Sequence, residues 1–198
     1  MRIIGGELKS RRIAFPKSKL TRPMTDRTKE TVFNILGSLI SRKHVLDLYA
    51  GSGSLGLEAL SRGATDVTFV DKADWATRVI EKNLEGLDLG DKALVLQMDV
   101  FRAITKLEKD KRRYSLIFVD PPFNRSLVKK TLLRLDQSDI VAPFGQVVVG
   151  HSNHEPLPES LGALKLARTK KIGQASLSFL FRLESQDGET KSYISGEF

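Results

Sequence analysis

Apolar runs of strand length alternate with helix-like segments along most of this chain, and this alternation constrains the fold more than any other feature. HVLDLY, DVTFVD, ALVLQMD, YSLIFVD and QVVVGH read as buried strands, because most of their residues are β-branched or otherwise apolar. Segments 54–63, 74–87, 100–112 and 127–135 have helical patterns, and Gly63 ends the first of them. The alternation predicts an α/β fold with a doubly wound, mostly parallel sheet.

The two ends of the chain have different patterns. LKLARTKKIGQASLSFLFRLES predicts two antiparallel strands that turn at Gly173 and Gln174, so the sheet should contain an antiparallel C-terminal strand. Near the start, Thr25 or Asp26 is expected to cap a helix, whose apolar side should contain Val32, Phe33, Leu36, Leu39 and Ile40. RIIGGELKSRRIAF predicts a small β-hairpin, which divides the chain into an appendage at 1–20 and a main domain at 21–198.

Positive charge is concentrated at the start of the chain. The net charge is +8, and residues 1–30 contain nine Lys or Arg against three Asp or Glu, a local net charge of +6. A solvated basic tail is one explanation. The short apolar runs on either side of Gly5 and Gly6 favour a folded hairpin instead, and a folded basic segment favours binding to a nucleic-acid backbone.

Composition excludes several classes of protein. The chain has no cysteine, which rules out disulfides and thiolate metal sites and favours an intracellular location. Its three histidines lack a matching carboxylate pattern, so we expect no metal. No signal-peptide core and no membrane-length apolar run occurs. We therefore expect a soluble cytoplasmic protein, with a monomer as the default.

A glycine-rich loop follows the first predicted strand. In LDLYAGSGSLGLEAL, Gly51, Gly53 and Gly56 form a G-x-G-x-x-G pattern that lets backbone approach a nucleotide and points helix N–H groups at it. Because plain strand-to-helix turns also contain such glycines, the surrounding residues matter. Asp71 ends the following strand, where a carboxylate can bind both ribose hydroxyls; capping of the strand end is the alternative.

Two further carboxylates favour S-adenosylmethionine as the cofactor. Asp47 lies just before the glycine loop, where it would repel a pyrophosphate and attract the ammonium group of an amino-acid-bearing nucleoside. Asp99 ends a third strand and could accept the adenine amino protons, with the Val100 N–H directed at the ring. Helix capping explains Asp99 equally simply. The carboxyl ends of parallel strands meet at one edge, where open α/β folds bind ligands.

The stretch FVDPPFN stands at the end of the fourth predicted strand. Pro121 and Pro122 have no N–H, so Asp120 and backbone carbonyls are the groups left to face a ligand. These acceptors suit an exocyclic amine, because bonds from both of its protons free the nitrogen lone pair for attack on a sulfonium methyl. Phe123 would stack on the base and Asn124 would help to position it. The structural alternative is a stiff loop with a partly buried phenylalanine.

DPPF following DLYAGSGSLG resembles the amino-methyltransferases of the class I, S-adenosylmethionine-dependent type, which have a seven-stranded Rossmann-like sheet. MRIIGGELKSRRIAFP, TRPMTDRTKETVFNIL, LDLYAGSGSLGLEALSRGA and GQASLSFLFR are together similar to the bacterial family that methylates guanine N2 in small-subunit (16S) rRNA. The resemblance implies methyl transfer from S-adenosylmethionine to that RNA, with an assembled or partly assembled small subunit as the substrate.

The residue patterns and the resemblance together predict three groups of site residues. The catalytic group is Asp120, Pro121, Pro122 and Phe123. The cofactor-binding group is Asp47, Gly51, Gly53, Asp71, Asp99 and Val100. The RNA-binding group is Arg2, Lys9, Arg11, Arg12, Arg22, Thr25 and Asn124. The family tends to have glutamate in place of Asp71 and after the fifth strand, where this chain has GHSNHE, so that strand end receives no predicted role.

Three other functions remain open. A DNA or RNA adenine-N6 or cytosine-N4 methyltransferase would use the same acceptors, and only the product separates it from a guanine enzyme. A non-catalytic RNA-binding ribosome assembly factor could retain a decayed cofactor site, although the complete glycine loop and DPPF argue against decay. A nicotinamide oxidoreductase would leave both DPPF and the basic segment unexplained.

Overall fold

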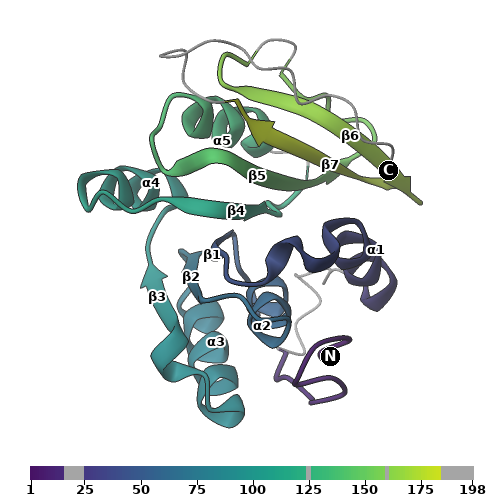
Figure 1. The fold of residues 1–198 in the computed structure, drawn as a ribbon, viewed down its shortest axis with the longest axis vertical. Helices are drawn as coiled ribbons and strands as arrows, with labels where there is room; N and C mark the ends of the chain where they lie inside the picture. The colour runs from purple at the N-terminus through teal and green to yellow at the C-terminus, as the bar shows by residue number, and fades with distance from the viewer. Residues whose placement is uncertain (16–24, 124–125, 159–160, 184–198) are drawn as a thin grey trace.

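A single seven-stranded sheet runs through the protein, in the order β3-β2-β1-β4-β5-β7-β6 (Figure 1). The structure, a computed structural model, describes residues 1–15, 25–123, 126–158 and 161–183. Its strands are β1 (His44–Leu48), β2 (Asp66–Asp71), β3 (Ala93–Gln97), β4 (Tyr114–Val119), β5 (Val141–Ser152), β6 (Leu164–Ile172) and β7 (Ala175–Arg182). Strands β1 to β5 are parallel, and β7 runs antiparallel between β5 and β6.

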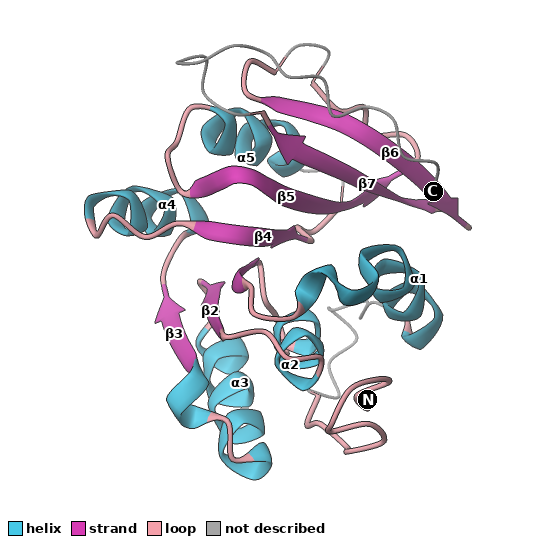
Figure 2. Ribbon diagram, in the orientation of Figure 1, coloured by secondary structure: helices cyan, strands magenta, loops and turns pink. Residues whose placement is uncertain are grey.

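Helices cover both faces of this sheet (Figure 2). They are α1 (Asp26–Leu36), α2 (Ser54–Ser61), α3 (Asp74–Leu87), α4 (Val100–Lys109) and α5 (Leu127–Asp136), with short 3-10 turns at η1 (Gly37–Ile40) and η2 (Gly90–Lys92). Helices α1, α2 and α3 share one apolar cluster with alternate strand residues, whereas α4 and α5 share a second cluster with the others. The predicted doubly wound fold, with its antiparallel C-terminal strand, is confirmed. None of the helices described is long and apolar enough to cross a membrane.

Two sequence predictions about packing are wrong. Strand β5 begins at Val141, whereas the predicted strand QVVVGH begins at Gln146. A register shift against β4 accommodates the intervening residues, which include Pro143 and Gly145. Leu39 is 51% exposed, although it was predicted on the apolar side of the first helix. The buried side of α1 contains Lys29 in addition to apolar residues, because its Nζ lies 3.7 Å from Glu58 Oε2 in an ion pair closed to solvent.

The N-terminal segment 1–15 is packed against the main fold. It forms a loop closed by one antiparallel bridge between Arg2 and Arg12, in place of the two strands of the predicted hairpin. Ile3 is buried in the core, and Glu58 Oε2 accepts a hydrogen bond from the Ile4 N–H at 2.9 Å. Figure 1 shows the segment beside α1 and α2. The predicted domain boundary at residue 20 lies outside the described residues.

Candidate active site

The strand order places the predicted acidic residues along one edge of the sheet. Strands β3, β2, β1, β4 and β5 are neighbours and point the same way, so their carboxyl ends lie side by side. Along this edge follow Asp99, Asp71, the loop after β1, Asp120 and Gly150. The sequence-predicted cofactor and catalytic residues are thus brought together in the order in which we assigned them, from the adenine end of the cofactor to the target amine.

The loop after β1 requires left-handed backbone at three positions. The φ angles are +63° at Tyr49, +55° at Gly51 and +76° at Gly53, and glycine adopts such angles without steric cost. A Cβ atom at Gly51 would have no neighbour within 4 Å, so open space lies beside this part of the loop. The strained Tyr49 is held by a 2.7 Å hydrogen bond between its hydroxyl and that of Thr131 on α5.

The third glycine of the pattern has a packing role. A Cβ atom at Gly56 would lie 2.2 Å from the ring of Phe69 on β2, so its absence allows α2 to lie against the sheet. This close packing fixes the start of α2 below the loop. Gly56 therefore supports the site without facing the ligand side.

Asp71 joins the end of β2 to the glycine loop. Its Oδ2 accepts a hydrogen bond from the Gly51 N–H, and its Oδ1 accepts one from the Ala73 N–H, both at 2.9 Å. A carboxylate can accept about four hydrogen bonds in all. Because Asp71 is only partly buried, it has the capacity to bind a ribose hydroxyl while keeping both backbone contacts.

Asp47 lies beneath the loop and is 2% exposed. Its Oδ2 accepts a hydrogen bond from the Gly56 N–H at 2.9 Å. Burial raises the pKa of this carboxyl well above its ordinary value, and the nearby Asp120 and Asp71 carboxylates raise it further. A cation bound above the loop would favour the ionised form. Attraction of the cofactor ammonium by Asp47 remains a prediction.

Asp99 caps helix α4, which was the structural alternative to adenine binding at this position. Its Oδ1 accepts hydrogen bonds from the N–H groups of Phe101 at 2.9 Å and Arg102 at 3.4 Å. The side chain is exposed, and Val100 follows it as the first residue of the helix. Both residues stand at the β3 end of the edge, and their contact with adenine stays a prediction.

Asp120 differs from the other three carboxylates because, within the described residues, no donor reaches its oxygens. It is partly buried, and burial raises its pKa from 3.8 to about 6. Next to it, Pro121 is buried, whereas Phe123 is 38% exposed and available at the surface of the edge. The acceptor expected from DPPF is therefore present, with an exposed ring two residues beyond the first proline.

Gly150 is a functional candidate that the sequence reasoning missed. A Cβ atom at this position would lie 2.4 Å from Oδ1 of Asp120. Any larger residue at this point of β5 would therefore displace the carboxylate. No local pattern in the sequence marks this contact, because it joins two neighbouring strands that are far apart along the chain.

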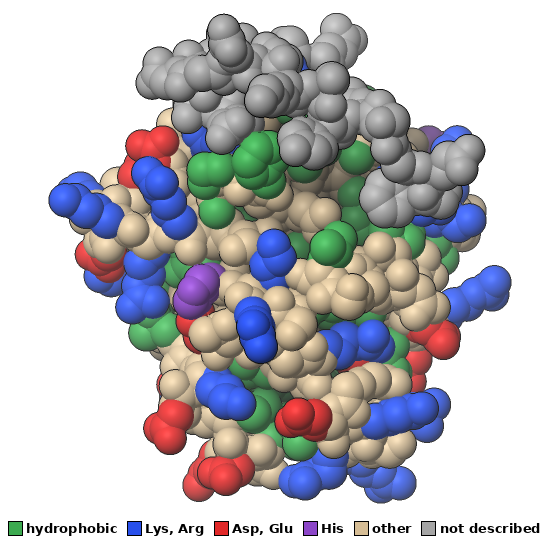
Figure 3. All heavy atoms as spheres, viewed as in Figure 1, with side chains coloured by type: hydrophobic (Ala, Val, Ile, Leu, Met, Phe, Trp, Pro, Cys, Tyr) green, Lys and Arg blue, Asp and Glu red, His purple; other side chains and the backbone are tan. Residues whose placement is uncertain are grey.

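Four of the predicted RNA-binding residues lie on the docked N-terminal segment, namely Arg2, Lys9, Arg11 and Arg12, and all are exposed. Blue side chains are spread over the lower half of the face seen in Figure 3, around this segment. Arg2 pairs with Asp26 at 3.3 Å, and Arg11 donates to the Gly86 carbonyl at 2.9 Å. Thr25 caps α1 by accepting from the Thr28 N–H. Arg22 and Asn124 lie outside the described residues.

Asn83 on α3 links the basic segment to the glycine loop, which sequence reasoning also missed. Its Nδ2 donates to the carbonyls of Ser52 and Ala14, both at 3.1 Å, and its Oδ1 accepts from the Ala14 N–H. These partners are far apart in sequence, and no local pattern marks their contact. Asn83 therefore connects the segment predicted to bind RNA to the loop predicted to bind the cofactor.

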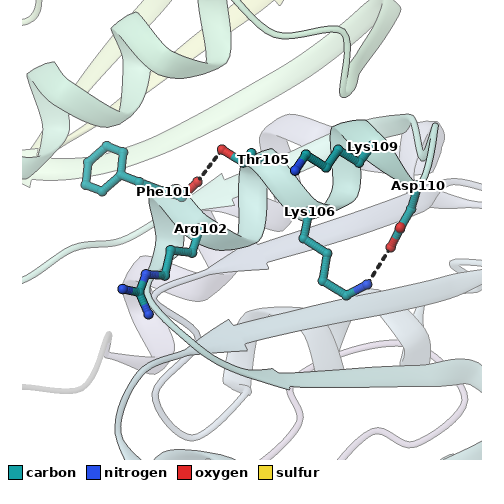
Figure 4. A pocket seen from close by; sticks show the side chains of 6 residues that line it. All are labelled: Phe101, Arg102, Thr105, Lys106, Lys109 and Asp110. Carbon is teal, nitrogen blue, oxygen red and sulfur yellow. Dashed lines mark hydrogen bonds and ion pairs between the residues drawn. The ribbon is translucent and has the colours of Figure 1, made fainter.

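A shallow hollow on the outer side of α4 is a weaker candidate site (Figure 4). It has a volume of about 590 Å³ and is lined by Phe101, Arg102, Thr105, Lys106, Lys109 and Asp110. Lys106 Nζ pairs with Asp110 Oδ2 at 2.8 Å, and the other side chains spread along the helix without converging. The convergent acceptors lie at the carboxyl edge, so we place the active site there. The described residues contain no cluster of three or more potential metal ligands.

The sheet has a nucleotide-type loop after β1, and the neighbouring strands β2 and β4 each lead to an aspartate at the same edge. These features are those of a Rossmann-like methyltransferase of the S-adenosylmethionine-dependent class. Residues 1–181 match the family model described as Conserved hypothetical protein 95, and the chain belongs to this family. This match and the relatives below confirm the resemblance to the methyltransferase family and S-adenosylmethionine as the cofactor. The guanine-N2 target stays a prediction.

Curated and solved relatives support this assignment. Ribosomal RNA small subunit methyltransferase D of Escherichia coli is 35% identical over 186 residues, which are 94% of this chain and 91% of the relative. The solved structure of Escherichia coli yhhF, described as a candidate methyltransferase, has a TM-score of 0.84 at 32% identity and covers 93% of this chain and 99% of its own. An RNA methyltransferase from Salinibacter ruber, in complex with S-adenosyl-L-homocysteine, shares the fold at 13% identity, with a TM-score of 0.64 over 86% of this chain and all of its own.

Proposed function

We propose that this protein transfers a methyl group from S-adenosylmethionine to the exocyclic N2 amine of a guanine in 16S rRNA. The observation that carries the proposal is the carboxylate of Asp120, which is partly buried, has no protein donor within the described residues and lies on the strand next to the glycine loop. The name of the Escherichia coli relative, a ribosomal RNA small subunit methyltransferase, supports the choice of RNA.

The residues along the edge fit S-adenosylmethionine. The open space beside Gly51 admits a ligand close to the backbone, and Asp71 stands beside it with acceptor capacity for a ribose. Asp47 provides negative charge below the loop for the ammonium group, while Asp99 and Val100 stand where adenine would lie. Bound S-adenosylmethionine supplies the methyl group and keeps the electron pair of the broken sulfur–carbon bond.

The residues of the chain orient the amine and receive its proton. Asp120 would accept one amine proton and the Pro121 carbonyl the other, which favours a pyramidal nitrogen with an available lone pair. The nitrogen lone pair forms the new bond to carbon, and one proton must then leave. Because burial raises the pKa of Asp120 to about 6, this carboxylate is a stronger base than an ordinary aspartate and can take that proton. No covalent intermediate with the enzyme is needed.

The exposed ring of Phe123 is suited to receive the target base. A base in folded RNA must leave its stack before its amine can enter a pocket, and aromatic side chains bind such splayed bases by stacking. At 38% exposure the ring is accessible beside Asp120. The exposed arginines and lysine of the N-terminal segment would hold the backbone of the RNA, which we propose is presented by an assembled or partly assembled small subunit.

The product identifies the function. Labelled S-adenosylmethionine would be incubated with unmodified small subunits, unmodified 16S rRNA and duplex DNA, and the nucleosides analysed after digestion. We expect N2-methylguanosine from the ribosomal substrates alone, and far less of it with Asp120→Asn. Methyladenine or methylcytosine would keep the acceptor chemistry and refute the guanine assignment. Cofactor binding without any product would instead favour the RNA-binding assembly factor.

A further inference from the structure

Strand β6 is a basic edge of the sheet that no predicted role uses. Residues Lys165 to Lys171 are all exposed, and the nine residues of the strand include four lysines or arginines and no aspartate or glutamate. Among the described strands β6 pairs only with β7, so it lies at the edge of the sheet. The four basic residues are Lys165, Arg168, Lys170 and Lys171.

An irregularity in the pairing places three of these side chains on one face. Lys165 lies opposite Phe181, Arg168 opposite Phe179 and Lys170 opposite Leu177, with a register shift between Leu166 and Arg168. Cross-strand partners point to the same face, and alternate residues of β7 share a face. In a regular strand without this register shift, Lys165 and Arg168 would point to opposite faces, because they are three residues apart. We call Lys165, Arg168 and Lys170 the β6 cation row.

The cation row faces the same side of the sheet as Asp120. Gly150 pairs with Leu177 on β7, and Leu177 pairs with Lys170, so these residues form one line across the sheet. The Asp120 carboxylate lies where a side chain of Gly150 would project, which places it on the face of Lys170. Three strand spacings separate β4 from β6, a distance of about 14 Å.

The row also runs toward the active-site edge. Strands β5 and β6 are both antiparallel to β7, so β6 points in the same direction as β4 and β5. Its C-terminal end, with Lys170, therefore lies at the carboxyl edge, and Lys165 lies further back along the same face. The row therefore ends at the same edge of the sheet as Asp120.

We infer that the β6 cation row binds the phosphate backbone of the substrate RNA next to the target nucleotide. This inference rests on the proposed RNA substrate and adds a second contact surface, separate from the N-terminal segment. Three exposed cations in a line, with no acid on the strand, complement a phosphate backbone, and their position fixes the direction in which the RNA leaves the active site. The N-terminal segment would bind the RNA on the other side, beyond the glycine loop.

Charged residues also protect open sheet edges from pairing with other chains, and this is the structural alternative. Edge protection requires charged side chains on the strand, but it does not require them to point to one particular face of the sheet. It does not explain why the register shift places Lys165 together with Arg168 and Lys170. The two explanations differ in their effect on RNA binding, which can be measured.

The test compares two triple variants of the full chain. The first, Lys165→Gln with Arg168→Gln and Lys170→Gln, removes the row. The matched control, Lys92→Gln with Lys109→Gln and Arg113→Gln, removes three exposed cations from the opposite, amino edge of the sheet. A third variant, Lys165→Arg with Arg168→Lys and Lys170→Arg, keeps the charge. Binding to unmodified 16S rRNA and to small subunits is measured at several salt concentrations, together with KM and kcat.

Removal of the row should raise KM about tenfold. It should also make the salt dependence of RNA affinity less steep: the plot of log affinity against log salt should lose about 2 from the magnitude of its negative slope, because three phosphate contacts to a single strand are lost. The control and the charge-keeping variant should match the wild type. Equal behaviour of row and control variants would overturn the inference, as would aggregation of the row variant with normal RNA binding by its monomer. Weaker binding to small subunits with unchanged binding to naked RNA would assign the row to a protein partner, and so would also overturn the inference.

Failure of the inference can be distinguished from failure of the proposed function, because RNA binding is measured apart from turnover. A wild type that makes no N2-methylguanosine refutes the proposed function, and the salt slopes still test whether the row binds RNA.

Discussion

Asp71 and Asp120 stand on either side of the same strand, yet the protein uses these two carboxylates in opposite ways. Asp71 ends β2 and accepts backbone N–H groups from Gly51 and Ala73. Asp120 follows β4, lies against Gly150 and receives no hydrogen bond from the described residues. Hydrogen bonds to its charged form stabilise a carboxylate, whereas burial without them destabilises it.

The difference supports two roles: Asp71 holds the glycine loop, and Asp120 is proposed to bind the substrate. Asp71 holds the glycine loop in place whether or not a ligand is bound. Within the described residues Asp120 accepts no hydrogen bond, so its oxygens are available to the amine of the proposed substrate. Four variants or conditions test this contrast, beginning with the largest expected effect.

Asp120→Asn should lower the rate of methyl transfer roughly a thousandfold, because the amide cannot act as a base or as a charged acceptor. Affinity for S-adenosylmethionine should stay close to that of the wild type. Single-turnover transfer to small subunits and calorimetric cofactor binding measure the two properties. The exposed Asp91→Asn is the matched control. Loss of cofactor affinity equal to that caused by Asp71→Asn would show that the two roles are wrongly assigned.

Gly150→Ala should lower kcat about a hundredfold, because the new methyl group would lie 2.4 Å from Oδ1 of Asp120 and displace the carboxylate. The matched control is Gly90→Ala, since a Cβ atom at Gly90 has open space. Both variants are compared in kcat and in thermal midpoint. Normal turnover by Gly150→Ala would mean that the position of Asp120 is not critical.

Lowering the pH should reduce kcat about tenfold per unit below pH 6 and leave it level above, because only the ionised Asp120 accepts the amine protons and its pKa is about 6. Single-turnover rates between pH 5 and about 8 measure this fall in kcat at low pH. The Asp120→Glu variant should shift the pH at which kcat begins to fall. A kcat that stays level down to pH 5 would contradict the raised pKa of Asp120.

The same two residues should have opposite effects on stability at neutral pH. Asp71→Asn leaves one backbone N–H facing an amide donor and should lower the free energy of unfolding by about 1–2 kcal/mol. Asp120→Asn should raise it by roughly 1 kcal/mol after allowance for partial solvent exposure, because the pKa of Asp120 is raised on folding and its charge opposes folding above about pH 6. Urea unfolding at pH 7.5 measures both. The gain from Asp120→Asn should disappear near pH 4, where the wild-type carboxyl is protonated.

The sequence predicted most of the fold, because hydrophobic period and glycine positions determine local structure. Helix α3 has the predicted bounds, and the turn at Gly173 joins the two C-terminal strands as expected. Errors occurred where a contact distant in sequence overrides the local pattern. Lys29 is buried because Glu58 and the Arg2 carbonyl satisfy its ammonium, and no reading of α1 by itself could show these partners.

The candidate site was predictable only in part. The carboxyl-edge rule brought Asp71, Asp99 and Asp120 together correctly, since it depends on strand direction alone. It could not distinguish a carboxylate already bonded to backbone from one that is not. The fit of Gly150 against Asp120 and the line from Gly150 to Lys170 both depend on register, which a sequence does not display.

The most direct test of the contrast is a titration of the aspartate carboxyl carbons by NMR in the cofactor-free protein, with Asp120→Asn used to assign the Asp120 signal. We expect the signal lost in Asp120→Asn to titrate with a midpoint of about 6. A midpoint near 3.8 would show that donors or water already stabilise this carboxylate, and would contradict the claim that Asp120 awaits the amine of its substrate.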